Sequence, residues 1–170
     1  MQIYIFGHKN IIEYEHRPYK NVEEMDNVMI ELWNSTVTKN DLVYVLGDFS
    51  FYNGEKTNEI LKQLKGKKIL IVGNHDYKFL QDKKFDKNLF EEITMYKVIK
   101  KKKTVICMCH YPLAEWDKKH CGSIHLYGHI HTIDNDAQRY MITQKNCWNV
   151  GIDTCGKLIN INDFIERNQK

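Results

Sequence analysis

Apolar residues in the first half of the chain fall into short runs that alternate with helical stripes. The segments Gln2–Phe6, Leu42–Leu46 and Lys68–Val72 are short and largely apolar, which predicts strands. Between them, Asn21–Trp33 and Lys56–Leu64 repeat apolar residues at the spacing of a helix. This alternating order implies parallel pairing with right-handed crossovers, so ligand-binding residues are expected beyond the carboxyl ends of the strands.

The predicted helices have recognisable ends. Asn21 and Glu24 resemble a capping box at the start of the first helix, and Gly66 ends the second. The apolar stripe of the first helix consists of Val22, Met25, Met29, Leu32 and Trp33. Both segments are therefore expected to be helices on the outside of the sheets.

The second half of the chain differs, because short β-rich runs follow one another. Ile93–Ile99 and Thr104–Cys109 are joined by Lys100–Lys103, which predicts a hairpin turn. Further strands are expected near Ile124–Tyr127, Cys147–Val150 and Lys157–Ile161, arranged as a meander. The two halves together predict an α/β fold in which two mixed sheets pack face to face and are flanked by helices, a four-layer α-β-β-α sandwich.

Length and composition fit one enzyme-sized domain over residues 1–170. The chain has 170 residues, of which 42% are hydrophobic and 28% charged, enough for one substantial core. Its net charge of +3 is too mild to indicate an extended nucleic-acid surface, although it suits an anionic substrate. The sequence shows no long apolar run and no secretory signal pattern, so we expect a cytoplasmic protein without a membrane partner. Its five cysteines form no C-x-x-C pair and are expected as reduced thiols.

Metal-binding residue types follow the predicted strands. Leu46-Gly47-Asp48 ends one strand, Gly73-Asn74-His75-Asp76 follows the next, and Gly128-His129-Ile130-His131 follows a third. With His110, the side chains of Asp48, Asn74, His129 and His131 form a set of oxygen and nitrogen ligands without thiolate. Such a set suits Mn, Fe, Zn, Co or Ni.

The spacing of these residues favours a paired metal site. An aspartate can bridge two cations, and His129 and His131 leave the same face of an extended backbone. Two cations roughly 3.5–4 Å apart would clamp a phosphate and activate a water to attack phosphorus. The chemistry expected from these residues is metal-assisted phosphoester hydrolysis.

The order of the motifs resembles that of the calcineurin-like metallophosphoesterases. The resemblance rests on Gly47-Asp48, Gly73-Asn74-His75-Asp76, His110-Tyr111-Pro112 and Gly128-His129-Ile130-His131, and it spans nearly the whole chain. The chain also resembles the small single-domain bacterial and phage branch, in which Phe6–Ile12, His110–Leu113 and Asn149–Asp153 have counterparts. The resemblance implies a metallophosphoesterase-like fold with two divalent metal ions per site, Mn being the first candidate.

The same resemblance implies a role for each residue. Asp48 would bridge the metals, and one site would be completed by Asn74, His110 and His129, while His131 would belong to the other. His75 would face the phosphate, where it stabilises charge or protonates the leaving group. Asp76 would orient His75.

One departure from the family pattern concerns the first motif, Asp-x-His, at the end of the first strand. Here Gln2–Phe6 runs directly into Gly7-His8, as if a few residues carrying the motif had been lost. The second metal site would then keep only Asp48 and His131. We expect one complete and one incomplete metal site, with His8 as a candidate replacement ligand.

Several alternatives remain open from the sequence. Gly73–Asp76 could be a strand-ending turn, His110 could be a packed histidine, and Cys107 and Cys109 share one strand face and are expected in the core. The first functional hypothesis is an active phosphodiesterase or phosphomonoesterase for a small or nucleotide-like substrate. The second is a metal-binding relative with impaired catalysis. The third is a nucleic-acid-binding protein using Lys100–Lys103, which lacks a recognition module. The sequence indicates neither the oligomeric state nor the substrate.

Overall fold

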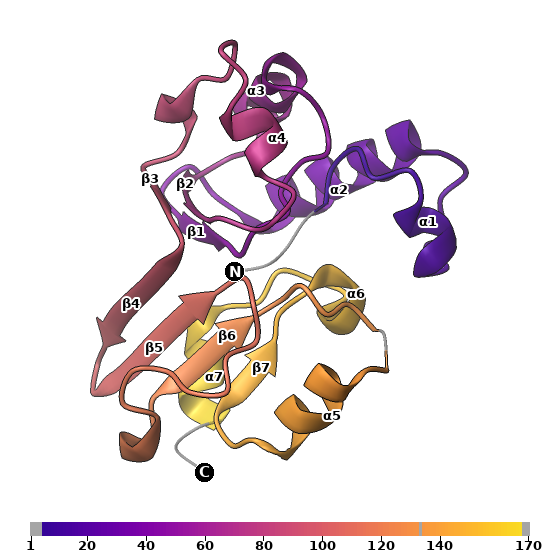
Figure 1. Ribbon diagram of the computed structural model, residues 1–170. Coiled ribbons are helices and arrows are strands. Elements are labelled where there is room, and N and C mark those ends of the chain that lie inside the picture. The colour runs from indigo at the N-terminus through magenta and orange to yellow at the C-terminus, as the bar shows by residue number, and fades with distance from the viewer. Residues whose placement is uncertain (1–4, 133, 168–170) are drawn as a thin grey trace.

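Two stacked β-sheets form the centre of the computed structural model, which describes residues 5–132 and 134–167 (Figure 1). In the first sheet, β1 (Leu42–Val45), β2 (Lys67–Ile71) and β3 (Glu92–Thr94) are parallel and lie in the order β1-β2-β3. The predicted parallel pairing of the first half of the chain is confirmed.

The second sheet is mixed and has the order β4-β5-β6-β7. Its strands are β4 (Tyr96–Lys101), β5 (Thr104–Cys109), β6 (Ile124–Tyr127) and β7 (Cys147–Asn149). The hairpin of β4 and β5 is antiparallel as predicted, but β5 pairs with β6, and β6 with β7, in parallel. The predicted meander is therefore wrong, because crossovers return the chain to the same end of the sheet before β6 and again before β7.

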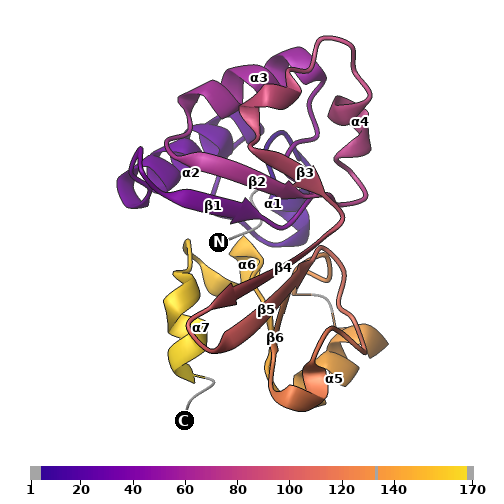
Figure 2. The same cartoon turned by 90° about the vertical axis from the view of Figure 1, so that its left-hand side faces the viewer.

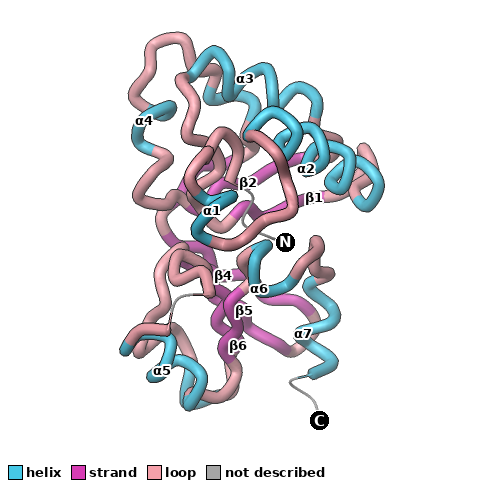
Figure 3. The backbone as a smooth tube through the Cα atoms, turned by 90° about the vertical axis from the view of Figure 1, so that its right-hand side faces the viewer, coloured by secondary structure: helices cyan, strands magenta, loops and turns pink. Residues whose placement is uncertain are grey.

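Helices cover both outer faces of the stacked sheets (Figures 2 and 3). The α-helices are α1 (Ile11–Tyr14), α2 (Val22–Thr36), α3 (Gly54–Gln63), α4 (Tyr77–Leu80), α5 (Asp136–Thr143), α6 (Ile152–Cys155) and α7 (Ile161–Arg167). Short 3-10 helices span Lys87–Leu89 and Lys119–Cys121. None of the helices within the described ranges is long and apolar enough to cross a membrane.

Alternation along the strands divides the core into layers. Successive residues of a strand point to opposite faces, so Val43 and Val45 pack with α2 and α3, while Tyr44 faces the second sheet. The layer between the sheets also contains Ile69, Ile71, Ile106, Met108, Ile124 and Leu126, together with Phe164 and Ile165 of α7. On the far side of the second sheet, Tyr127 packs with Met141 of α5. The four-layer α-β-β-α arrangement is confirmed.

Helix α2 begins with the predicted capping residue Asn21, but Glu24 binds a different backbone group from the one expected in a capping box. The side chain of Asn21 accepts the backbone N–H of Glu24 at 2.9 Å, as in a capping box. The Glu24 carboxylate accepts the N–H of Lys20 rather than that of Asn21. In the predicted stripe, Met25, Met29 and Trp33 are buried, whereas Leu32 is 44% exposed.

Three strand predictions need correction. The run Ile93–Ile99 is divided between β3 and β4, so it connects the two sheets instead of forming one strand. Lys100 and Lys101 belong to β4, so the hairpin turn is shorter than predicted. Lys157–Ile161 is not a strand, and its last residue begins α7.

Two further segments differ from the sequence prediction in other ways. Most of the predicted strand Gln2–Phe6 lies outside the described residues, but Phe6 forms a parallel bridge with Ser50. Helix α5 was not predicted, because its apolar residues do not share one buried face. Met141 is buried, whereas Tyr140 is 46% and Ile142 is 74% exposed.

A fully buried histidine, His125, stabilises the loop that follows β5. Its ring stacks between Trp116 and Tyr127, and its Nδ1 lies 3.3 Å from the carbonyl oxygen of Cys107. Its Nε2 accepts the backbone N–H of Leu113 at 3.1 Å. Both ring nitrogens are therefore satisfied when the imidazole is neutral, and a second proton would oppose the Leu113 N–H. Burial lowers the pKa of His125 to about 4.

We predict that His125 makes the folded state sensitive to acid. Below pH 6.5 the unfolded chain binds a proton that the folded chain does not bind until the pH reaches about 4, so stability falls as pH falls through this window. Between these limits the wild type should lose up to about 3 kcal/mol more than His125→Gln, in which an amide oxygen can still accept the Leu113 N–H. Urea unfolding at several pH values measures this, with the exposed His120→Gln as control. Equal pH slopes in wild type and His125→Gln would contradict the prediction.

Candidate metal centre

Two glycines allow the ends of β1 and β2 to approach the second sheet closely. Gly47 has a φ of 82°, and a Cβ placed on it would lie 2.4 Å from Nδ1 of His110. A Cβ on Gly73 would lie 2.4 Å from Oδ1 of Asp48. Side chains at these positions would push the loops apart, which gives the glycines of both motifs a structural reason.

Four side chains converge where the strands of both sheets end. Ligand atoms of Asp48, His110 and His129 all lie within 4.8 Å of one another, the one such group of three or more among the described residues. Nε2 of His110 lies 3.3 Å from Oδ2 of Asp48 and 3.2 Å from Nδ1 of His129. The same nitrogen lies 3.1 Å from Oδ1 of Asn74. The structure thus brings together all four residues predicted for the complete metal site.

The hydrogen bonding of His110 leaves a ligand atom directed at the centre of this group. Its Nδ1 lies 2.7 Å from the carbonyl oxygen of Leu46, which can only accept, so Nδ1 carries a proton. In neutral His110, Nε2 therefore presents a lone pair to the Asp48 carboxylate and the Asn74 oxygen. Oxygen and nitrogen atoms that can all act as ligands thus face one another here, an arrangement that suits a cation.

The pKa values of His110 and Asp48 also favour a cation at this position. Burial lowers the pKa of His110, but its hydrogen bond and charge interaction with Asp48 outweigh burial and raise it. Burial raises the pKa of Asp48, but His110 and the backbone N–H of His75 outweigh it and lower that pKa. Both shifts favour a positive charge between Nε2 and Oδ2, so the residues fit a bound divalent cation.

The carboxylate of Asp76 connects the two loops that carry Asp48 and Asn74. It is fully buried and accepts backbone N–H groups from Gly73 at 2.8 Å, Asp48 at 3.0 Å and Phe49 at 2.7 Å. Burial raises its pKa to about 7, against the effect of these hydrogen bonds. The family resemblance implied that Asp76 orients His75, and the partners that the structure shows for its carboxylate are backbone groups of both loops.

His75 lies beside this cluster. Its backbone N–H donates to Oδ1 of Asp48 at 2.9 Å, and its ring packs against Phe51 with centroids 4.5 Å apart. Both contacts leave the ring nitrogens of His75 uninvolved.

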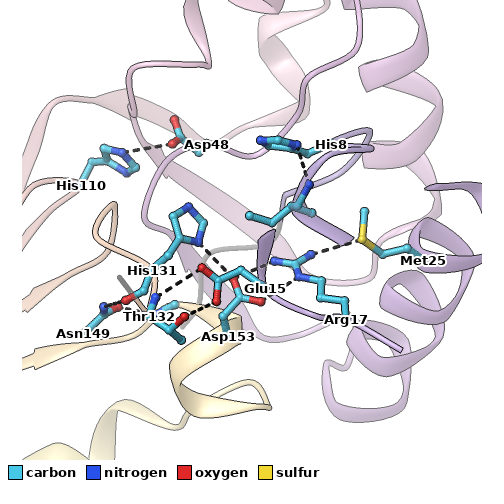
Figure 4. Close-up of polar contacts among 12 residues, drawn as sticks. His8, Glu15, Arg17, Met25, Asp48, His110, His131, Thr132, Asn149 and Asp153 are labelled. Atoms are coloured by element: carbon cyan, nitrogen blue, oxygen red, sulfur yellow. Dashed lines mark hydrogen bonds and ion pairs between the residues drawn. The ribbon is translucent and has the colours of Figure 1, made fainter. Parts of the chain in front are cut away.

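His131 lies outside the group of Asp48, His110 and His129, and it has a different set of partners. Its Nδ1 lies 3.1 Å from Oδ2 of Asp153, and Arg17 binds both oxygens of the same carboxylate at 2.7 and 2.8 Å (Figure 4). Burial raises the pKa of Asp153, but these two partners outweigh it and lower it. Arg17 belongs to no sequence motif and was not predicted, and Asp153 was noted only as part of the segment Asn149–Asp153 in the family resemblance.

A small cavity lies between His131 and the main cluster. It has a volume of about 10 Å³, roughly the room for one water molecule, and its lining includes Ile5, Asp48, His131 and Asp153. Because Ile5 offers no ligand atom, this wall of the cavity is apolar. His8 also lies outside this ligand group, and its Nδ1 accepts the N–H of Ile11 at 3.1 Å.

Comparisons with known proteins agree with this geometry. The sequence model of the calcineurin-like phosphoesterase family matches residues 16–150 of the chain. An uncharacterized protein, MJ1445 of Methanocaldococcus jannaschii, is 32% identical over 150 residues, covering 87% of this chain and 77% of that protein. The Gene 66 protein of Mycobacterium phage L5 is 26% identical over 191 residues, covering 94% and 88% of the two chains. The crystal structure of a protein of unknown function, AQ665 from Aquifex aeolicus, superimposes with a TM-score of 0.74 at 25% identity, covering 98% of this chain and 96% of that one.

We predict that Asp76→Asn weakens the metal centre without touching a ligand. The amide replaces an acceptor oxygen by N–H groups that oppose donated backbone N–H groups, which should cost about 1–3 kcal/mol of stability. Affinity for Mn²⁺ should fall about 10–100-fold, as for other groups that position ligands. Calorimetric titration with Mn²⁺ and urea unfolding measure both effects.

The matched control is Asp82→Asn. Asp82 also accepts backbone N–H groups, from Gly54 and Lys84, but it is only partly buried and lies outside the ligand group. Its substitution should leave Mn²⁺ affinity unchanged. Wild-type Mn²⁺ affinity in Asp76→Asn would refute the positioning role.

Proposed function

Because the chain belongs to the calcineurin-like phosphoesterase family, we propose that it is a metal-dependent hydrolase of phosphodiesters or phosphomonoesters. The observation that carries this proposal is the close approach of three side chains to Nε2 of His110. These are the side chains of Asp48, Asn74 and His129. A small or nucleotide-like phosphoester is the proposed substrate.

Mn²⁺ is the proposed cofactor of this site, and these four residues would hold it. When bound, such a cation polarises a phosphoryl oxygen and lowers the pKa of a water. The contribution of the chain is a fixed set of ligands: Leu46 sets the tautomer of His110, and the backbone N–H of His75 holds one oxygen of Asp48. His131, held by Asp153, would serve a second cation.

His75 is proposed to act as the proton donor. As water adds to phosphorus and the bond to the leaving oxygen breaks, the imidazolium of His75 would give its proton to that oxygen and become neutral. Its packing against Phe51 and the attachment of its backbone to Asp48 support this role, because both restrict the ring to the side of the metal centre.

A second candidate is a relative that binds one cation and turns over slowly. Ile5 lines the cavity beside Asp48 and His131, and the described residues contain one group of three ligands. A single cation polarises a phosphoryl oxygen but lacks the two-sided clamp of a metal pair. This candidate differs from the first in rate and in the number of bound metals.

One experiment tests the proposal and separates the two candidates. Hydrolysis of bis(p-nitrophenyl) phosphate and p-nitrophenyl phosphate is measured with added Mn²⁺, and bound metal is counted on the same samples. We expect turnover that Asp48→Asn abolishes together with metal binding. Turnover with close to two metals per chain supports the first candidate, and slow turnover with one metal supports the second. Hydrolysis that persists in Asp48→Asn would contradict both.

The same assay tests His75 separately from the metal. His75→Ala should keep the wild-type metal count and lower turnover by about 10²–10⁴, the range for a proton-transfer group. The exposed His120→Ala is the matched control and should be unchanged. Wild-type turnover in His75→Ala would remove His75 from the mechanism.

A further inference from the structure

The loop between Phe6 and α1 holds His8 in one tautomer. Nδ1 of His8 accepts the backbone N–H of Ile11 at 3.1 Å, at the start of α1. A nitrogen that accepts a hydrogen bond carries no proton, so neutral His8 has its proton on Nε2. Within the described residues, Nε2 has no protein hydrogen-bond partner.

Phe51 places His8 beside the proposed proton donor. The ring of His8 packs against Phe51 with centroids 4.1 Å apart, and His75 packs against the same phenyl ring at 4.5 Å. Figure 4 shows the free side of the His8 ring directed toward Asp48 and His110, with His131 below it. The Nε2–H group is therefore on the side of the ring that faces Asp48 and His110, and the shared contact with Phe51 places His75 near it.

The surroundings of His8 are rich in positive and donor groups. Burial lowers its pKa most, and the charges of His75, His131 and Arg17 lower it further, which together outweigh a hydrogen bond to the backbone of His8 that raises it. The neutral form with Nε2–H is thus favoured. A ring that offers N–H among further nitrogen donors suits an anion better than a cation.

We propose that His8 donates its Nε2–H to a non-bridging oxygen of the bound phosphoryl group and is a substrate-binding residue instead of a metal ligand. Metal binding through Nε2 would move the proton to Nδ1, where it would face the Ile11 N–H and break that hydrogen bond. Donation to an oxyanion keeps both contacts. No proton is transferred by His8, and His75 remains the group that protonates the leaving oxygen.

This inference rests on the proposed function, so its test uses the Mn²⁺-loaded full chain and inorganic phosphate as the probe. His8→Asn retains a side-chain oxygen at the reach of Nδ1, which can still accept the N–H of Ile11. The variant therefore keeps the loop and removes the distant donor. Its affinity for phosphate, measured by calorimetry, should fall about 10–100-fold while metal count and metal affinity stay at wild-type values.

Two further variants keep the test decisive. His8→Gln, whose longer amide offers an N–H group farther from the backbone, should recover part of the phosphate affinity. His16→Asn changes an exposed histidine of the same segment and should behave as the wild type. A lost metal ion in His8→Asn would make His8 a ligand and overturn the proposal, as would unchanged phosphate affinity. If the Mn²⁺-loaded wild type binds no phosphate, the proposed function fails first and this inference fails with it.

Discussion

The buried carboxylate of Asp76 is the interaction on which the candidate site depends. It accepts backbone N–H groups from the loop after β1 and from the loop after β2, and so holds Asp48 and Asn74 at a fixed separation. Removing a carboxylate from water is costly unless its oxygens are satisfied. Here the peptide groups of the two loops satisfy it, so the loops are held together by their own backbone.

The second sheet supplies the remaining residues of the ligand set, His110 and His129. The parallel pairing of β5 with β6 brings the strand ends that carry His110 and His129 to one edge, facing the ends of β1 and β2 across the inter-sheet layer. Leu46 then fixes the orientation of the His110 ring from the opposite sheet. The ligand set therefore forms only when the two sheets pack together, because each sheet carries part of it. The chemistry proposed for the chain depends on this packing.

Sequence patterns predicted the parallel half of the fold, because it depends on local signals, whereas the grouping of Asp48, Asn74, His110 and His129 followed from the family resemblance. Apolar runs ending in Gly-Asp or Gly-Asn-His-Asp mark the ends of β1 and β2, and strand ends of a parallel sheet meet at one edge. The pattern did not predict the direction of β6 and β7, since the connection from β5 to β6 contains only a short 3-10 helix, and α5, which connects β6 to β7, buries only Met141. Arg17 and the tautomer of His8 depend on contacts distant from any motif.

The most direct test of the account is to locate a metal ion in crystals grown with Mn²⁺. Anomalous diffraction should show a peak at a coordination distance of about 2 Å from Asp48, Asn74, His110 and His129. Nε2 of His110 should be the nitrogen that faces the peak, with Nδ1 still bonded to Leu46. A crystal saturated with Mn²⁺ that shows no peak at these four residues, or one centred on other side chains, would contradict the account.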